Sequence, residues 1–123
     1  MTSSSDALEV SLARYSVVVT RFPFTDLALA KPRPVLIMTD RSFHTASRHA
    51  VCSMITTGAQ SGWPQDLDIL DLGDAGLRKP CVVRAKIFTL PIEALVRQIG
   101  ALSPRDAGRL AQAWQGLLLG EAG

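Results

Sequence analysis

The pattern of hydrophobic and polar residues changes once along this chain, near residue 90. Ahead of that point, short apolar runs rich in β-branched residues predict five strands, at 15–22, 32–39, 50–56, 66–72 and 79–90. Because no helical periodicity separates these runs, the pattern predicts an antiparallel sheet or small barrel rather than alternating strands and helices. The chain is therefore expected to be mainly β (α+β), with its helices at the carboxyl end.

The periodicity after residue 90 predicts one or two helices. Pro91 suits a first helical position and Gly100 a helix end, and apolar residues recur at helical spacing between them. Farther along, Ser103 suits an N-cap, and Asp106 the acidic third position of a helix that ends near Gly120. The apolar faces comprise Ile92, Leu95, Val96 and Ile99 in the first helix, and Leu102, Leu110, Trp114, Leu117 and Leu118 in the second.

Length and composition narrow the class of protein. We expect residues 14–123 to form one domain with a buried core, behind a flexible leader at 1–13. No apolar run approaches the ~18 residues of a membrane span, and no secretory signal precedes the two cysteines, which favours a cytoplasmic protein with reduced thiols. The sequence holds no Cys/His cluster with zinc spacing and no cofactor motif, so neither metal nor cofactor is expected.

The distribution of charge says more than the net charge of +2. Residues 14–86 hold ten Lys and Arg against six Asp, a balance of +4, and ten of the thirteen cations in the chain are Arg. Arginine binds phosphate in a bidentate manner and is weakly hydrated. The basic centre therefore fits a polyanionic partner, and the alternative is a solvated, Arg-rich surface.

Arg33 is the first candidate for chemistry. It stands between two prolines that stiffen the backbone where a long loop, 23–31, enters the second predicted strand. A fixed guanidinium at such a junction suits the binding of a phosphate or oxyanion. The alternative is a structural salt bridge with Asp26 or Asp40.

Further polar residues lie in the third and fifth predicted strands. Thr56 and Thr57 come just before a glycine, where a hydroxyl can donate to a phosphoryl oxygen. Arg84 and Lys86 are expected to share one face of the fifth strand, with Lys79 close by along the chain. These cations either follow a phosphate backbone or keep an exposed sheet face soluble.

Aromatic, histidine and cysteine side chains give weaker signals. Trp63 lies in a loop, where it would stack on a base or cover the edge of the core. His44 and His49 are the only histidines, and each is either a general acid or base or an ordinary surface residue. Cys52 and Cys81 fall within predicted strands and are expected to be buried thiols.

Five short segments, taken in order, resemble the MazF/PemK family of toxin endoribonucleases. They are FPFTD at 22–26, RPVLIM at 33–38, ITT at 55–57, VVR at 82–84 and FTL at 88–90, and the resemblance runs from about 15 to 119. It implies a small SH3-like, PemK-like β-barrel with a C-terminal helix, in a homodimer. It also implies the toxin of a type II toxin–antitoxin pair, whose partners are single-stranded RNA and a cognate antitoxin.

The resemblance further implies a reaction and its residues. The 2′-OH of the RNA attacks the adjacent phosphate without a metal ion, leaving a 2′,3′-cyclic phosphate and a 5′-OH. Arg33 would stabilise the phosphate, Thr56 (or Thr57) would orient it, and Arg84 would bind the backbone or assist protonation. We expect further contacts to RNA from Lys31, Thr57, Lys79, Lys86, Trp63 and His44.

Departures from the family pattern keep two other functions open. Lys86 stands where some members have an acid, and 23–31 lacks the histidine that the same members carry. One alternative is therefore a nucleic-acid-binding barrel that no longer cleaves. The other is a gyrase-inhibiting toxin of the same fold class, which contacts its target through a Trp-containing helix, although Trp114 falls on the apolar stripe and fits a core position better.

Overall fold

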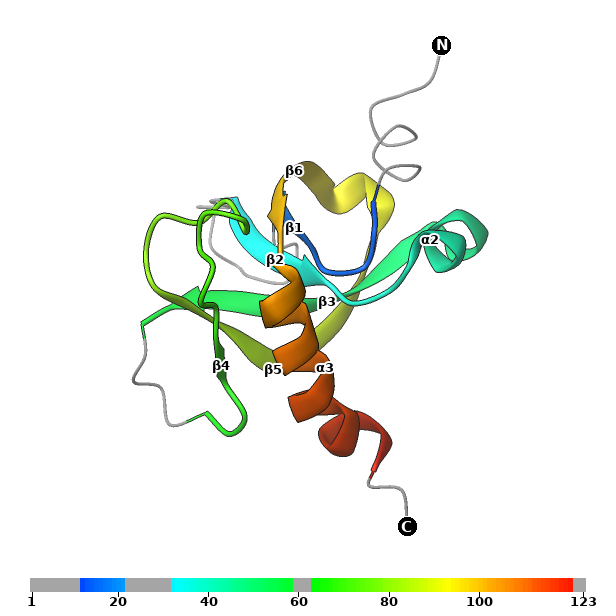
Figure 1. The fold of residues 1–123 in the computed structure, drawn as a ribbon. Helices are drawn as coiled ribbons and strands as arrows, with labels where there is room; N and C mark the ends of the chain where they lie inside the picture. Colours follow the sequence, from blue (N-terminus) through cyan, green and yellow to red (C-terminus); the bar gives the residue numbers. More distant parts are fainter. Residues whose placement is uncertain (1–11, 22–31, 59–62, 121–123) are drawn as a thin grey trace.

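The structure is a computed structural model that describes residues 12–21, 32–58 and 63–120 (Figure 1). The strands are β1 (Ser16–Thr20), β2 (Arg33–Ile37), β3 (His49–Thr57), β4 (Leu67–Asp68), β5 (Cys81–Pro91) and β6 (Leu95–Ala101). The helices are α2 (Arg41–Ser47) and α3 (Pro104–Leu119), and a single 3₁₀ turn, η1 (Ile92–Ala94), joins β5 to β6.

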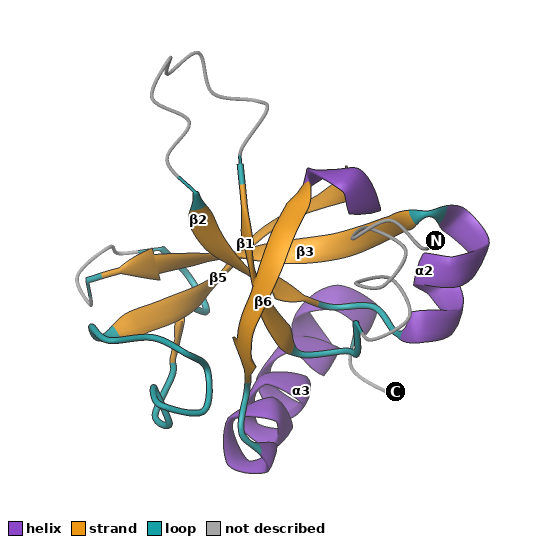
Figure 2. Ribbon diagram, turned by 90° about the horizontal axis from the view of Figure 1, so that it is seen from above, coloured by secondary structure: helices purple, strands orange, loops and turns teal. Residues whose placement is uncertain are grey.

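All described strands belong to one antiparallel sheet, in the order β4-β5-β3-β2-β1-β6. The sheet is strongly twisted, so that β6 runs at a steep angle to β3 (Figure 2). This mainly β, barrel-like architecture with a C-terminal helix confirms the predicted fold class.

Each face of the sheet is covered by its own hydrophobic core. Directly paired residues of neighbouring antiparallel strands point to the same face, and successive residues point to opposite faces. The first core lies between the sheet and α3, which crosses that face in Figure 1, and includes Val17, Leu36, Ile55, Val83, Leu110 and Trp114. The second core covers the other face and includes Leu12, Val18, Val35, Ile37, Cys52 and Leu90.

The helix expected between Pro91 and Gly100 is wrong. Only η1 is helical there, and the chain continues as β6, which pairs with β1 from Ser16↔Ala101 to Thr20↔Leu95. Without β6 the backbone of β1 would be left unpaired at the sheet edge, so the long-range pairing outweighs a marginal two-turn helix.

Gly100 permits the last step of this pairing. A Cβ at this position would lie 2.5 Å from the carbonyl oxygen of Asp74 and 2.5 Å from the carbonyl carbon of Ala75. The strand therefore comes into direct backbone contact with the turn that precedes β5, and the Ala101 N–H donates to the Asp74 carbonyl at 3.0 Å. The glycine that suggested a helix end serves a close approach of two backbones.

The strand expected at 66–72 is only two residues long, as β4. Beyond it the backbone N–H groups of Leu70 and Asp71 turn away from the sheet and donate to the carboxylate of Asp106 in α3. The alternating pattern of this segment therefore continues past the point where strand pairing ends.

Helix α2 falls in a segment for which no element was predicted. Asp40 caps its N-terminus by accepting from the Phe43 N–H at 3.1 Å, and Arg48 ends it at φ 61°. Only His44 of this helix is buried, so its sequence carries no apolar stripe to signal it.

Helix α3 confirms the second predicted helix. Ser103 is its N-cap and accepts from the Asp106 N–H at 3.1 Å, and Pro104 occupies the first position.

The described residues include no helix long and apolar enough to span a bilayer. The proposed leader lies outside the described residues except for its last two, of which Leu12 is buried in the second core.

Candidate nucleic-acid interface

Arg33, Thr56 and Arg84 lie on the same face of the sheet, on three adjacent strands. The strand register pairs Val35 with Met54 and Met54 with Arg84, so these three side chains share a face. Arg33 precedes Val35 by two residues and Thr56 follows Met54 by two, so both point the same way. We call the side of the sheet that carries Arg33, Thr56 and Arg84 the Arg84 face.

The first two of these residues stand where strands begin or end. Arg33 opens β2, pairs with Thr20 of β1 and is exposed. Thr56 is half-buried near the end of β3, and the exposed Thr57 and Gly58 follow it. Gly58 has φ +93° and open space around its Cβ position, so the backbone there is open to close approach.

Arg84 is held on two sides by residues that precede β4. Its Nε donates to Oδ1 of Asp66 at 3.2 Å and its Nη2 to Oδ2 at 3.1 Å, a bidentate ion pair. The side chains of Arg84 and Asp66 are only 17% and 14% exposed. The indole of Trp63 lies over the guanidinium, with its ring centroid 5.2 Å from Cζ.

Asp66 is the residue of this site that sequence reasoning missed. Leu67 pairs with Val83, so Asp66 comes opposite Arg84 when the register is continued by one residue. Trp63 is 42% exposed and lies over the Arg84 guanidinium, and its stacking on an RNA base stays a prediction. Knowledge of the hairpin register between β4 and β5 would have identified Asp66, but the residues alone do not fix that register.

The predicted lysines and the second threonine are less closely gathered. Lys86 is exposed within β5, where the register with β3 shifts between Met54↔Arg84 and Ser53↔Ile87. Lys79 is exposed two residues before β5, at the sheet end where Thr57 pairs with Cys81. Lys31 lies outside the described residues.

The expectation that His44 contacts RNA conflicts with its burial. Its side chain is 0% exposed, and its ring nitrogens lie 2.8 Å from the Thr39 hydroxyl and 3.3 Å from the Leu12 carbonyl oxygen. The imidazole thus fastens α2 to the chain ahead of β1 and offers no surface to a polymer. His44 does not belong to the candidate interface.

The salt bridge considered for Arg33 is formed by a different arginine. Asp40 pairs with Arg14 at 3.6 Å, and Asp26, the other partner considered, lies outside the described residues. Asp40 caps helix α2 by accepting from the Phe43 backbone N–H, and this hydrogen bond is the main reason that the pKa of the Asp40 carboxyl is lowered.

Neither cysteine is set up as a nucleophile. Both are free, buried thiols, as the sequence predicted. Burial raises the pKa of the Cys52 thiol to about 12 and raises the pKa of Cys81 as well. The reactive thiolate is therefore disfavoured at both positions.

In the described part of the chain, His, Cys, Asp and Glu side chains nowhere gather in a group of three or more that would hold a metal ion.

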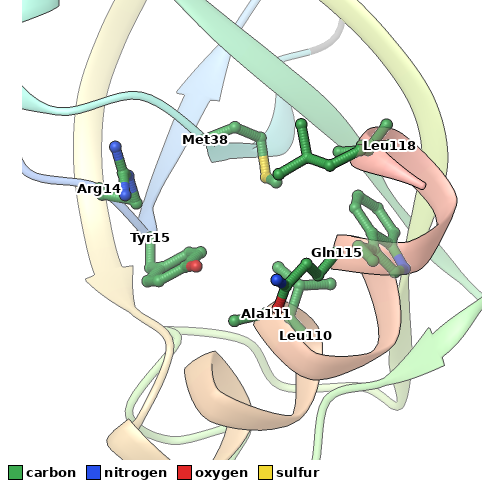
Figure 3. A pocket seen from close by; sticks show the side chains of 9 residues that line it. Arg14, Tyr15, Met38, Leu110, Ala111, Gln115 and Leu118 are labelled. Atoms are coloured by element: carbon green, nitrogen blue, oxygen red, sulfur yellow. The ribbon is translucent and has the colours of Figure 1, made fainter. Parts of the chain in front are cut away.

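A separate apolar groove of about 480 Å³ lies on the side of the sheet that α3 covers, and Figure 3 shows the side chains that line it. It lies between α3 and the residues that flank β1 and β2. Its lining consists of Arg14, Tyr15, Met38, Leu110, Ala111, Trp114, Gln115, Leu118 and Leu119. Trp114 is 2% exposed and Leu119 is 81% exposed, so the inner end of the groove adjoins the first core and its outer end is an exposed apolar rim.

Comparison with known proteins identifies the family. Residues 13–118 match the PemK-like, MazF-like toxins of type II toxin–antitoxin systems, and the chain belongs to this family. No curated protein matches the sequence.

Solved structures share the fold. The Mycobacterium tuberculosis toxin MazF-mt6 is 25% identical, with a TM-score of 0.69 over 87% of this chain and 99% of that one. MazF in a MazE–MazF structure from Deinococcus radiodurans is 18% identical, with a TM-score of 0.68 over 89% of this chain and 97% of that one. A mycobacterial endoribonuclease in complex with its cognate antitoxin is 19% identical, with a TM-score of 0.64 over 90% and 96% of the two chains.

Proposed function

We propose that this toxin is an endoribonuclease that cleaves single-stranded RNA, including mRNA, at short sequences and without a metal ion. The observation that carries the proposal is the common face of Arg33, Thr56 and Arg84, on three adjacent strands of the sheet. Two guanidinium groups and a hydroxyl on one face match the needs of a phosphodiester whose negative charge increases during reaction.

The proposed reaction needs no nucleophile from the protein. The 2′-hydroxyl of the RNA loses its proton to water as its oxygen bonds to the adjacent phosphorus. The bond from phosphorus to the 5′-oxygen breaks, and that oxygen takes up a proton from water, leaving a 2′,3′-cyclic phosphate and a 5′-OH. Arg33 stabilises the charge on the phosphorane and Thr56 donates to a non-bridging oxygen. Arg84 binds the phosphate or assists protonation of the departing 5′-oxygen. Because arginine keeps its charge in proteins, we assign the two guanidinium groups an electrostatic role.

The experiment is a cleavage assay on single-stranded RNA of mixed sequence in the presence of EDTA. We expect the purified protein, free of antitoxin, to produce fragments with cyclic-phosphate and 5′-OH ends. Arg33→Ala should slow cleavage by about 100-fold or more, the typical effect of removing one donor to a developing oxyanion. Arg97→Ala is the matched control, because it removes the same exposed charge from β6, two strands away from β2. Intact RNA after incubation with folded wild-type protein would refute the proposal.

A second candidate function is RNA binding without cleavage. Lys86 stands where some family members carry an acid, and the Asp66 carboxylate is engaged by Arg84. Salt-dependent binding of RNA that stays intact would select this function. The gyrase-directed alternative loses its support, because Trp114 is 2% exposed and cannot contact a target through its indole face.

We also propose a protein antitoxin as partner. Two of the similar structures are toxin–antitoxin complexes. A flexible tail with acidic and apolar residues would complement the arginines of the Arg84 face. Because the proposed substrate is mRNA, we place the protein in the cytoplasm.

A homodimer is the third proposed association. Leu118 and Leu119 line the apolar groove and are 51% and 81% exposed, and the neighbouring Leu117 is 46% exposed. Exposed apolar residues gathered beside a groove often mark a protein–protein interface. We therefore place the interface between two copies along the groove and the end of α3.

A further inference from the structure

We propose that Asp66 is a positioning residue for Arg84, and that α3 controls this positioning through the segment that carries Asp66. The inference rests on the proposed function, because it concerns how the Arg84 face meets a phosphate. It adds an acidic residue to a site that must bind a polyanion. The structure explains why such a charge is useful there.

Asp66 and Trp63 restrain the guanidinium of Arg84 along one edge and on one face. The bidentate pair with Asp66 fixes the guanidinium in its own plane, at 3.2 and 3.1 Å. The Trp63 ring, 5.2 Å from Cζ, limits movement out of that plane. A guanidinium has five N–H donors, and Asp66 uses two of them, Nε–H and one on Nη2. Three donors, including both on Nη1, remain for a phosphate.

The burial of the pair favours positioning over exchange. Phosphate competes with carboxylate for a guanidinium, so RNA could in principle displace Asp66 from Arg84. Displacement would remove the bidentate ion pair from a carboxylate that is only 14% exposed and place that carboxylate beside a polyanion, which is unfavourable. We therefore infer that Asp66 stays in place while Arg84 meets the RNA.

Helix α3 fixes the segment that holds Asp66. The Trp114 indole N–H donates to the carbonyl of Gln65 at 3.3 Å, and the Arg109 guanidinium donates to the carbonyl of Asp68 at 2.9 Å. Beyond β4, the Asp106 carboxylate accepts from the N–H groups of Leu70 and Asp71 at 2.9–3.2 Å. Backbone on both sides of Asp66 is thus attached to one helix, which lies on the opposite face of the sheet.

The ion pair between Asp66 and Arg84 has different effects on the binding of RNA and on its cleavage. Asp66 neutralises Arg84, so the pair adds little to the general attraction of RNA, while a held guanidinium stabilises charge that develops on phosphorus. Removing the carboxylate should therefore lower kcat and leave KM unchanged or lower. A merely attractive role of Arg84 would predict tighter binding and no loss of kcat.

The test compares Asp66→Asn with Asp68→Asn in steady-state cleavage of a single-site RNA. Both variants remove one negative charge two residues apart, and Asp68 is exposed. We expect Asp66→Asn to lower kcat about tenfold or more, the cost of lost orientation, and to change KM by less than about threefold. Asp68→Asn should keep both constants within about twofold of wild type. Equal or higher kcat for Asp66→Asn refutes the positioning role.

A second measurement tests the arrangement without a variant that must fold. In NMR spectra of the wild-type protein, the Nε–H of Arg84 should show restricted motion and slow solvent exchange, unlike that of the exposed Arg97. A fully mobile Arg84 overturns the inference. Wild-type protein that leaves RNA intact refutes the proposed function and the positioning role with it. Active wild type matched by Asp66→Asn refutes the positioning role alone.

Discussion

Replacing Asp106 with alanine removes a carboxylate that is 1% exposed and makes four hydrogen-bond contacts. It accepts from the backbone N–H groups of Leu70 and Asp71 and from the Arg109 guanidinium at 2.9 Å. In Asp106→Ala, the two backbone donors lose their acceptor, and Arg109 loses its ion-pair partner. The variant therefore probes how firmly α3 holds the segment after β4.

The size of the effect follows from these contacts. Hydrogen bonds to a charged group contribute about 1.5–3 kcal/mol each, and breaking a buried pair costs about 3–5 kcal/mol. Arg109 is 36% exposed and can be rehydrated, so we expect a loss at the lower end, about 3 kcal/mol. With an unfolding entropy of about 2.1 cal/mol/K per residue, this loss lowers Tm by about 12 °C.

The assay is urea and thermal unfolding followed by circular dichroism. Asp68→Ala is the matched control, because it removes an exposed carboxylate nearby and should change stability by no more than about 0.5 kcal/mol. A loss of less than about 1 kcal/mol for Asp106→Ala would show that water replaces the carboxylate at little cost. That result would refute the account of α3 as an anchor.

Two further predictions concern pH and assembly. The Arg105 guanidinium and, to a lesser extent, the Ser103 hydroxyl lower the pKa of the Asp71 carboxyl below its ordinary 3.8. Because the folded state favours the carboxylate, this stabilisation is present above that ordinary pKa and is lost as pH falls below it. The free energy of unfolding of Asp71→Asn should therefore be lower than that of wild type at pH 7, and the two values should converge as the pH is lowered in unfolding titrations. A difference that stays constant with pH would contradict the stabilising role of the Asp71 carboxylate. Leu118→Glu should convert the proposed dimer to monomers, as measured by light scattering. Val96→Glu is the control and should leave the dimer intact, because Val96 lies on β6 and is about as exposed as Leu118. An unchanged mass for Leu118→Glu would exclude the groove as the interface.

Elements defined by local signals could be predicted from the sequence. Helix α3 has an N-cap serine, a proline at its first position and a complete apolar stripe within one stretch, and each of these acts locally. Strand β6 has no such signal, because its structure depends on β1, some eighty residues earlier. A short apolar run of helical spacing is also compatible with a strand when a sheet edge offers pairing.

Some residues of the candidate site could be predicted from the sequence and others could not. Arg33, Thr56 and Arg84 could be singled out because residue type and neighbouring sequence suggested phosphate chemistry. Their roles stay predictions, while the register that places them on one face is now described. Asp66 could not be selected, since its proposed role depends on its position opposite Arg84, which only the pairing of β4 with β5 reveals. His44 misled for a related reason: nothing in the neighbouring sequence shows that this histidine lies in a helix and packs inward against the chain ahead of β1.

The anchoring of Gln65, Asp68 and Leu70 by α3 has a consequence for protein synthesis. A ribosome releases the chain from its amino end at about 5–20 residues per second. Arg33, Thr56 and Arg84 are therefore all made before Asp106, Arg109 and Trp114, which fix the segment beside Arg84. A nascent chain can therefore contain Arg33, Thr56 and Arg84 and still lack the helix that fixes the segment beside Arg84. If the chain cleaves RNA as proposed, this competence would arise only after α3 has emerged from the exit tunnel, so that nascent chains without α3 would spare the message being translated.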